Sequence, residues 1–166
     1  EFFTTLRKKN NVLLSADVQG FVRVVRGEAL VYEPWEEMTE VLKNLDILKS
    51  DAVEAEYLTG ETDIEKAARI FAALGPKEIV LTHSEGVMIH AEGKCYHYRF
   101  HSNSMEGRSG RGDTCVGSYV SKRLTLPPRE AGKWAAAVTS LKVERKGPFD
   151  RPISEVEAFI HKYYQD

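Results

Sequence analysis

A glycine-rich loop that ends in an acid holds the residues of this chain best suited to chemistry. The segment Gly107–Asp113 reads Gly-Arg-Ser-Gly-Arg-Gly-Asp, and a helix is predicted directly after it, over 114–124. Glycines allow positive φ, so that successive N–H groups can point into one concavity. The start of the following helix adds unpaired N–H groups and the positive end of its dipole. The loop therefore predicts a binding site for an anion such as phosphate.

The acid at the end of this loop, Asp113, suggests what the site does. A carboxylate repels a bound phosphate, so its position there suits a base that accepts the proton of a hydroxyl group attacking the phosphate. Asp113 would equally serve as a helix N-cap, because aspartate is common at that position. Local physics does not separate these two interpretations. A P-loop is excluded, since no Gly-Lys-Ser/Thr follows at the required spacing.

Strands and helices are predicted to alternate in the first half of the chain. A buried strand is expected at 12–16, a helix at 36–45 and a second short strand at 46–49. Asp63 can cap an amphipathic helix over 63–74, which Gly75-Pro76 ends. A clear strand follows at 78–82, and the segments 87–90 and 95–100 indicate an antiparallel hairpin.

The second half is predicted to be helical. Helices are expected at 114–124, 129–143 and 154–164, the last with Ser154 as its cap and Glu157 three residues later. This order indicates an α/β layered fold, with a mainly parallel sheet, an antiparallel hairpin at one edge and flanking helices. In such sheets ligands bind at the C-terminal ends of the strands.

Composition and charge exclude several classes of function. The 166 residues, 42% apolar and 29% charged, suit one soluble globular domain. A net charge of −2 provides no basic field for nucleic acid or anionic lipid, and no apolar run reaches the roughly 20 residues of a membrane helix. Cys95 and Cys115 lack metal-ligand spacing, so a reduced, cytoplasmic chain without a disulfide is expected. The spacing of the histidines does not favour a metal site either.

The order of the motifs resembles the PfkB (ribokinase-like) carbohydrate kinase family. The resemblance covers essentially the whole chain, but only the C-terminal part of that family's fold. The family signature Asp-Thr-x-Gly-Ala-Gly-Asp aligns with Gly107–Asp113. This alignment implies that Asp113 is the catalytic base and that Gly110, Arg111 and Gly112 form the anion hole. The family's Asn-x-x-Glu motif aligns with Asp51–Glu54, which implies a Mg²⁺ role for Asp51 and Glu54, mostly through water.

The same resemblance implies a nucleotide site. Strand 79–82 and turn 83–86 are similar to the family's nucleotide-side strand and turn, and 135–139 and 146–148 to its adenine-side helix and loop. The segment 17–20 with Arg23 resembles the stretch after the family's mid-chain strand. The residues implied to bind nucleotide are Thr82, Ser84, Gly86, Ala137, Lys146 and Gly147.

The chain departs from the family pattern at several positions. Gly107 and Arg108 replace the first Asp and Thr of the signature, and Arg111 replaces its central Ala. Because backbone N–H groups form the anion hole, these changes need not destroy it. Arg111 can contact a phosphate bidentately, or it can point to solvent or pair with a surface carboxylate. Asp51 replaces an asparagine; its carboxylate suits a divalent cation and also an N-cap for the helix predicted at 52–58, and the two roles can coexist.

Nothing in the chain corresponds to the N-terminal region of the family, which holds most sugar contacts and a β lid. The resemblance implies an ATP- and Mg²⁺-dependent kinase for a sugar, nucleoside or polyol, with residues 1–166 as its nucleotide-binding, catalytic part. We expect the chain alone to be a poor kinase, because positioning supplies much of the rate. The alternative is a non-catalytic nucleotide-binding or assembly module. Surface left by the missing region predicts self-association. The sequence leaves open the acceptor, and whether the chain is a natural truncation or a fragment.

Overall fold

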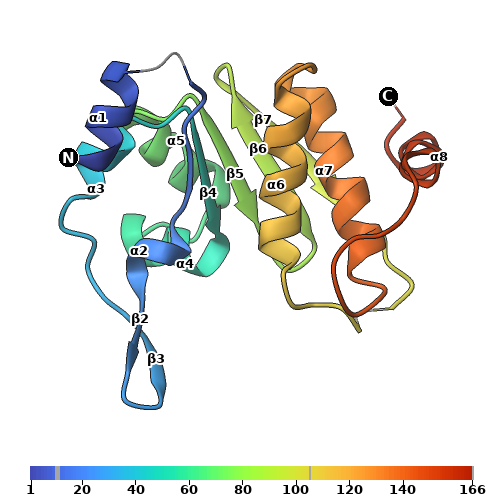
Figure 1. The fold of residues 1–166 in the computed structure, drawn as a ribbon, viewed down its shortest axis with the longest axis horizontal. Coiled ribbons are helices and arrows are strands. Elements are labelled where there is room, and N and C mark those ends of the chain that lie inside the picture. The colour runs from blue at the N-terminus through green and yellow to red at the C-terminus, as the bar shows by residue number, and fades with distance from the viewer. Residues whose placement is uncertain (10–11, 105, 166) are drawn as a thin grey trace. The chain divides into compact units, whose positions relative to one another are not determined.

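The computed structural model describes residues 1–9, 12–104 and 106–165. Helices and strands alternate along the first half and helices dominate the second, as predicted (Figure 1). The elements, in chain order, are α1 (Phe2–Lys9), β1 (Ser15–Asp17), α2 (Gln19–Val22), β2 (Arg23–Arg26), β3 (Ala29–Tyr32), α3 (Met38–Leu42), β4 (Ile47–Asp51), α4 (Ala52–Thr59), α5 (Ile64–Ala73), β5 (Glu78–Thr82), β6 (Gly86–Ala91), β7 (Lys94–Arg99), α6 (Arg111–Arg123), α7 (Pro128–Lys142) and α8 (Ile153–Tyr163).

The main sheet has five strands in the order β1-β4-β5-β6-β7. Strands β1, β4 and β5 are parallel, with Ser15 opposite Ile47 and Ile47 opposite Glu78. Strands β6 and β7 at the edge are joined by Glu92 and Gly93, whose φ values of 53° and 72° suit the two-residue turn of an antiparallel hairpin. The predicted fold class, a mainly parallel sheet with a hairpin at one edge and flanking helices, is confirmed.

The chain divides into two compact units, of which the first comprises residues 1–82 and 90–95. Its parallel strands read as nearly continuous apolar runs because they are covered on both faces: all of β5 and the first four residues of β4 are buried. Helices α4 and α5 pack on this pair of strands. Fully buried side chains of this core include Leu42, Ile47, Leu48, Phe71, Ile79 and Leu81.

Helix α5 shows how local signals place an element of the first unit. The Asp63 carboxylate accepts the N–H groups of Glu65 and Lys66, which confirms the predicted cap. The apolar stripe buries Phe71 completely, a burial that contributes about 1.5–3 kcal/mol. Gly75 then lets the chain turn close to α3, since a Cβ there would lie 2.5 Å from the Leu42 carbonyl oxygen.

The second unit comprises residues 83–89 and 96–166. Helix α6 lies beside α7, and α7 packs on α8 (Figure 1). Most of α7 is buried, including the run Ala135–Ala137. Gly132 allows this helix to approach β7, because a Cβ there would lie 2.5 Å from the Tyr98 ring. The Tyr98 hydroxyl donates to the Arg129 carbonyl oxygen at 2.8 Å, which fixes the two elements together.

Some elements were not predicted from sequence. Helix α1 carries no capping signal; it is anchored instead by Arg7, which donates to Asp46 at 2.6 Å. The β2–β3 hairpin, which turns at Gly27 with a φ of 62°, was also missed. The predicted Ser154 cap is wrong, because α8 begins earlier with Pro152 as its N-cap and Ser154 lies within the first turn. Proline is tolerated at this position, since an N–H group there would have no intrahelical acceptor.

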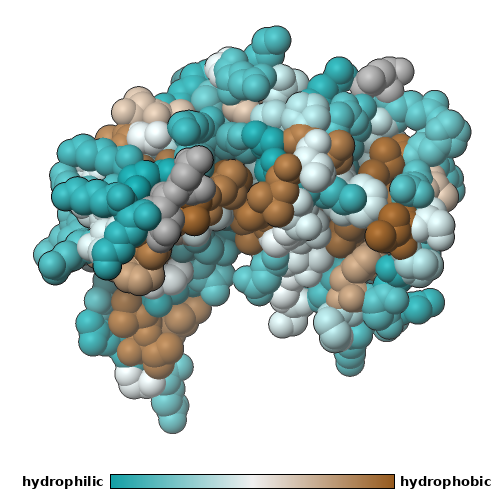
Figure 2. All heavy atoms as spheres, turned by 45° about the horizontal axis from the view of Figure 1, so that its top comes forward, coloured by the Kyte–Doolittle hydropathy of each residue, from teal (hydrophilic) through white to brown (hydrophobic). Residues whose placement is uncertain are grey.

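The β2–β3 hairpin carries apolar side chains that are exposed to solvent. Val25 and Leu30 lie opposite each other across its two strands and are 68% and 60% exposed. Figure 2 shows apolar side chains gathered on this hairpin. Val53 and Tyr57 on α4 are also exposed, and the Tyr57 ring lies 5.2 Å from that of Tyr32 on β3.

Candidate active site

The glycine-rich loop leads directly into α6. Gly110 is the N-cap of the helix and adopts φ 73°, a left-handed conformation that favours glycine. The Thr114 N–H group donates to the Gly110 carbonyl oxygen at 3.0 Å. The helix therefore begins three residues earlier than predicted, and Asp113 lies inside its first turn. The alternative in which Asp113 caps this helix is wrong.

The Asp113 side chain is exposed at the start of α6. Within the described residues, its carboxylate has neither a hydrogen bond nor an ion pair. The nearby N–H groups of Gly112 and Asp113 belong to the first turn, where no intrahelical acceptor exists. The second unit thus combines a free carboxylate with N–H donors at one helix terminus, which suits an acceptor of protons beside a bound anion.

A buried lysine that no sequence motif indicates holds the loop in place through hydrogen bonds. The Lys142 Nζ group donates to the carbonyl oxygens of Gly107, at 2.6 Å, and Ser109. The Gly107 N–H donates to the Val143 carbonyl oxygen at 2.8 Å, and a Cβ on Gly107 would lie 1.8 Å from the Arg145 carbonyl oxygen. Lys142 is only 5% exposed. In the sequence, this residue could be noticed only as a lysine at the end of α7, after a run of mostly apolar or small residues.

The loop arginines take up different environments. Arg111 is the first residue of α6, and its guanidinium carbon lies 5.9 Å from the centroid of the Phe100 ring, within cation–π range. The structure thus places this side chain over an aromatic face, which neither sequence alternative anticipated. Arg108 is exposed. Contact between Arg111 and a phosphate stays a prediction.

Most of the residues predicted to bind nucleotide lie at or beyond the ends of elements, but Ala137 lies within a helix. Thr82 is buried at the end of β5 in the first unit, while Ser84 and Gly86 belong to the turn into β6 in the second. A Cβ on Gly86 would lie 2.2 Å from the Tyr98 carbonyl oxygen, so strand packing alone requires a glycine there. In the second unit, Ala137 is fully buried within α7. Lys146 and Gly147, which are also predicted to bind nucleotide, are exposed in the segment after that helix.

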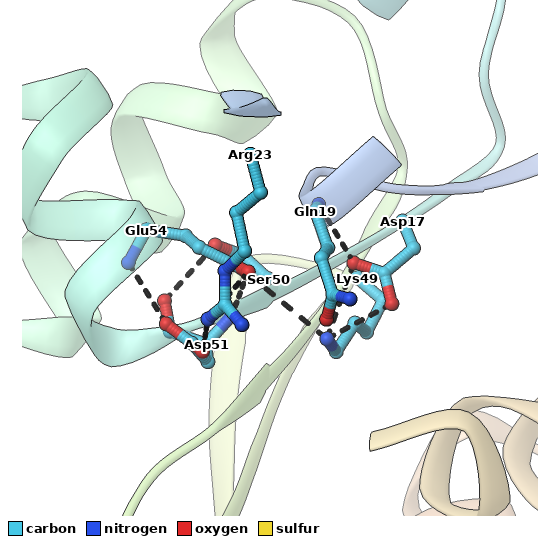
Figure 3. Close-up of polar contacts among 7 residues, drawn as sticks. All are labelled: Asp17, Gln19, Arg23, Lys49, Ser50, Asp51 and Glu54. Atoms are coloured by element: carbon cyan, nitrogen blue, oxygen red, sulfur yellow. Dashed lines mark hydrogen bonds and ion pairs between the residues drawn. The ribbon is translucent and has the colours of Figure 1, made fainter. Parts of the chain in front are cut away.

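The first unit holds a separate cluster of charged side chains around α4 (Figure 3). The Asp51 carboxylate accepts the Glu54 N–H at 2.8 Å, and the Glu54 carboxylate accepts the Asp51 N–H at 2.8 Å. These reciprocal bonds form a capping box at the start of α4. The predicted N-cap role of Asp51 is confirmed.

Two cations, Arg23 and Lys49, pair with the three carboxylates of this cluster. Arg23 Nη2 lies 2.8 Å from Asp51 Oδ2 and 3.1 Å from Glu54 Oε1, while Lys49 Nζ lies 2.9 Å from Asp17 Oδ2 and 4.0 Å from Glu54 Oε2. Glu54 is fully buried and Lys49 is 3% exposed. Burial raises the pKa of Glu54, against the opposing effects of the Asp51 N–H and Lys49. Burial alone would lower the pKa of Arg23, but Glu54 and other neighbours raise it.

The cluster does not provide a direct set of metal ligands. The described part of the chain contains no group of three or more His, Cys, Asp or Glu side chains placed to hold a metal ion. Both carboxylates already contact Arg23 and backbone N–H groups. Glu54 Oε1 makes no hydrogen bond, but it is fully enclosed. The Asp51 side chain is a quarter exposed and can contact a hydrated cation through water.

Other sequence expectations concern thiols and membranes. Cys95 and Cys115 are free thiols. No helix among the described residues combines the length and the apolar character needed to cross a membrane.

The chain matches no protein-family model and no curated protein sequence. It is similar to solved structures, among them a pyrophosphate-dependent myo-inositol-1 kinase converted by mutation into a myo-inositol-3 kinase: 42% identity, TM-score 0.86, covering 99% of this chain and 58% of that one. A pyrophosphate-dependent kinase in the ribokinase family, complexed with a pyrophosphate analog and myo-inositol, is 44% identical, with a TM-score of 0.84 and coverages of 94% and 56%. The Arabidopsis thaliana ribokinase complexed with ribose and ATP is 26% identical, with a TM-score of 0.66 and coverages of 74% and 43%. The chain thus spans little more than half the length of the first two structures.

Proposed function

Because this chain belongs to the ribokinase (PfkB) family of carbohydrate kinases, we propose that it supplies the base and the phosphate-binding loop for phosphoryl transfer to a hydroxyl group. Residues 1–166 would form the catalytic, donor-binding part of that enzyme. The observation that carries the proposal is the exposed Asp113 carboxylate, which makes no capping bond and lies in the first turn of α6, where backbone N–H groups lack intrahelical acceptors.

In the proposed reaction, Asp113 takes the proton of the acceptor hydroxyl while that oxygen forms a bond to phosphorus. The bond from phosphorus to the leaving oxygen breaks, and its electron pair stays on the leaving phosphate or diphosphate. Backbone N–H groups of the segment Gly110–Gly112 would stabilise the charge on the transferred group. Magnesium would supply neutralisation of phosphate charge when bound, and we propose that Asp51 contacts it through water while the buried Glu54 holds Asp51 in place through the capping box.

Two phosphoryl donors are supported by the relatives. ATP is present in the A. thaliana ribokinase complex, and it is the donor that the family resemblance implies; Thr82, Ser84, Gly86, Ala137, Lys146 and Gly147 would then contact the nucleotide. Pyrophosphate is the second candidate, because the relatives with 42% and 44% identity are pyrophosphate-dependent. Initial rates with each donor and Mg²⁺ decide between them, since the true donor gives turnover at micromolar to millimolar concentration.

The acceptor is proposed to be a small polyol or sugar. Myo-inositol is the first compound to test, because it is bound in the relative with 44% identity and named in the one with 42% identity. Ribose is the second, from the A. thaliana ribokinase complex. Phosphorylated product detected by mass spectrometry would identify the acceptor without assuming either compound.

Replacement of Asp113 tests the proposed chemistry. In the protein at its full encoded length, Asp113→Asn should lower kcat by about 10²–10⁴-fold while donor affinity is retained, because the amide cannot accept the proton. Asp150→Asn, at another exposed aspartate after α7, is the matched control and should keep wild-type turnover. Undiminished turnover in Asp113→Asn would remove this residue from the role of base.

The second candidate function is a nucleotide-binding or assembly module without catalysis. Its support is the altered signature, in which Gly107, Arg108 and Arg111 replace family residues. Calorimetry with ATP·Mg²⁺, pyrophosphate·Mg²⁺ and myo-inositol separates the two functions. Donor binding without acceptor binding or turnover favours the module, whereas binding of both with turnover favours the kinase.

We also propose self-association and a reducing, cytoplasmic location. The apolar pair Val25 and Leu30 is exposed on the β2–β3 hairpin, and such surface favours association. Sedimentation equilibrium of the wild type against Val25→Ser/Leu30→Ser tests this surface: a shift of the variant towards monomer supports it, and identical profiles contradict it.

The free thiols Cys95 and Cys115 suit a reducing compartment.

A further inference from the structure

The glycine-rich loop rests on the C-terminal end of α7. The Gly107 N–H donates to the Val143 carbonyl oxygen at 2.8 Å, and the Ser104 hydroxyl donates to the Glu144 carbonyl oxygen at 3.2 Å. Lys142, the last residue of α7, completes this attachment by donating to two carbonyl oxygens of the loop, those of Gly107 and Ser109. The same helix end that carries carbonyl acceptors thus also carries one buried ammonium donor.

These two lysine contacts determine which way the loop N–H groups point. In a planar trans peptide the C=O and the N–H point in opposite directions, and the described residues contain no cis peptide bond. When the Gly107 carbonyl faces Lys142, the N–H group of Arg108 must face away from it. Because the Ser109 carbonyl also faces Lys142, the N–H group of Gly110 likewise faces away from it. The carbonyl groups of Gly107 and Ser109 therefore point away from the face of the loop to which the N–H groups of Arg108 and Gly110 point.

Lys142 also lies close to the proposed base. A Cβ built on Gly110 would be 3.9 Å from Lys142 Nζ and 3.9 Å from Asp113 Oδ2. The two charged groups therefore both lie near Gly110. The ammonium of Lys142 makes its hydrogen bonds to carbonyl groups, so the Asp113 carboxylate stays available.

We propose that Lys142 is the positioning residue that sets the glycine-rich loop in its anion-binding conformation, by holding the carbonyls of Gly107 and Ser109 away from the bound phosphate. This inference rests on the proposed phosphoryl transfer, and it assigns to one side chain the orientation of the N–H donors. A neutral side chain at 142 would leave two carbonyls without a donor, and they could then turn towards the phosphate and repel it.

Helix α7 offers a matched control. Lys133 is 7% exposed, close to the 5% of Lys142, and pairs with Glu130 at 3.2 Å on the same helix. Replacing either lysine by methionine removes one buried ammonium from α7. Lys142 donates hydrogen bonds to the loop, whereas Lys133 pairs with Glu130 within the helix, so we expect the replacement of Lys142 to change loop function beyond a loss of stability.

Steady-state kinetics of the protein at its full encoded length supply the first test. We expect Lys142→Met to lower kcat by about 10²-fold with the acceptor KM nearly unchanged, as for the loss of one oxyanion donor. Lys142→Arg, which keeps charged donors, should recover part of that loss, and Lys133→Met should stay within about threefold of the wild type. Wild-type kcat in Lys142→Met, or an equal loss in Lys133→Met, would overturn the proposal.

Amide spectra test the loop independently of turnover. In ¹⁵N-labelled wild-type protein of full encoded length, pyrophosphate should shift the amide resonances of Arg108 and Gly110, and in Lys142→Met these shifts should be lost at the same concentration. If the wild type shows the shifts but no phosphoryl transfer, the proposed function fails while the role of Lys142 stands. If both proteins show equal shifts, or the wild type shows none, the role of Lys142 fails.

Discussion

The charged cluster of the first unit and the glycine-rich loop of the second use the same kinds of side chain in opposite ways. Around Glu54, the acids Asp17, Asp51 and Glu54 all have a cation or a backbone N–H as partner. In the loop, the one carboxylate, Asp113, is exposed, while the cation Lys142 is buried and bound to carbonyl groups. Pairing charges builds a rigid support, whereas leaving an acid unpaired beside N–H donors leaves it available to react.

This contrast predicts where each kind of mutation acts. Changes in the cluster should mainly alter the free energy of unfolding, because they remove partners from buried charges. A change of Asp113 in the loop should mainly alter turnover, because this exposed carboxylate supports no other group. Substitutions at four positions, each with a measurable effect on stability, sharpen the distinction.

The largest effect on stability is expected at Lys49. Lys49→Met removes a counter-charge from the fully buried Glu54 and from Asp17, and should lower the unfolding free energy by about 3 kcal/mol. Urea denaturation followed by circular dichroism measures it. The control Lys43→Met breaks an exposed pair with Glu40 and should cost less than about 1 kcal/mol. Equal losses of unfolding free energy in Lys49→Met and Lys43→Met would show that the cluster does not stabilise the fold.

A glycine of the loop should give the next largest effect. Gly107→Ala places a Cβ only 1.8 Å from the Arg145 carbonyl oxygen, and the backbone must shift to relieve the overlap. We expect a loss of about 2 kcal/mol, typical of overpacking. Gly117→Ala on α6, where a Cβ meets nothing within 4 Å, should instead stabilise the protein slightly. An unchanged melting temperature for Gly107→Ala would show that the loop does not dock on α7.

The cap of α4 should give an effect of about 1 kcal/mol. Asp51→Ala removes the acceptor of the Glu54 N–H and should destabilise by that amount. Asp51→Asn keeps a capping oxygen while it removes the charge that pairs with Arg23 at 2.8 Å. Thermal melts of the two variants therefore separate the cap from the ion pair. If both variants lose the same stability, the ion pair dominates.

The sequence was sufficient for the fold class because the signals of the main elements are local. The buried runs of β4 and β5, the Asp63 cap and the Glu92–Gly93 turn each depend on residues close together in the chain. The β2–β3 hairpin was missed although its turn at Gly27 is local, whereas helix α1 depends on a distant contact. Arg7 holds α1 through Asp46, far away in sequence, and no local pattern records that contact.

The sequence names candidate site residues for similar reasons. Asp113 and Asp51 stand out because their motifs are contiguous, but the start of α6 at Arg111 was not predicted, since a glycine N-cap leaves no side-chain signal. Lys142 could not be recognised as part of the site, because its partners Gly107 and Ser109 lie on another element. The ion pairs of Arg23 are likewise tertiary contacts.

The smallest effect concerns the pH dependence of stability, and it isolates Glu54 within the cluster. Burial raises the pKa of Glu54 above its ordinary value of about 4.3, despite the Asp51 N–H and Lys49. The folded protein therefore holds this proton more tightly than the unfolded chain does. The resulting contribution to stability is fully present at low pH and is lost as pH rises through the folded pKa, above the ordinary glutamate value. Unfolding free energies measured from pH 4 to pH 8 should thus fall less steeply for Glu54→Gln than for the wild type. A parallel pair of curves would show that Arg23 and Lys49 compensate the buried carboxylate completely, and the cluster would then be a fully neutralised support.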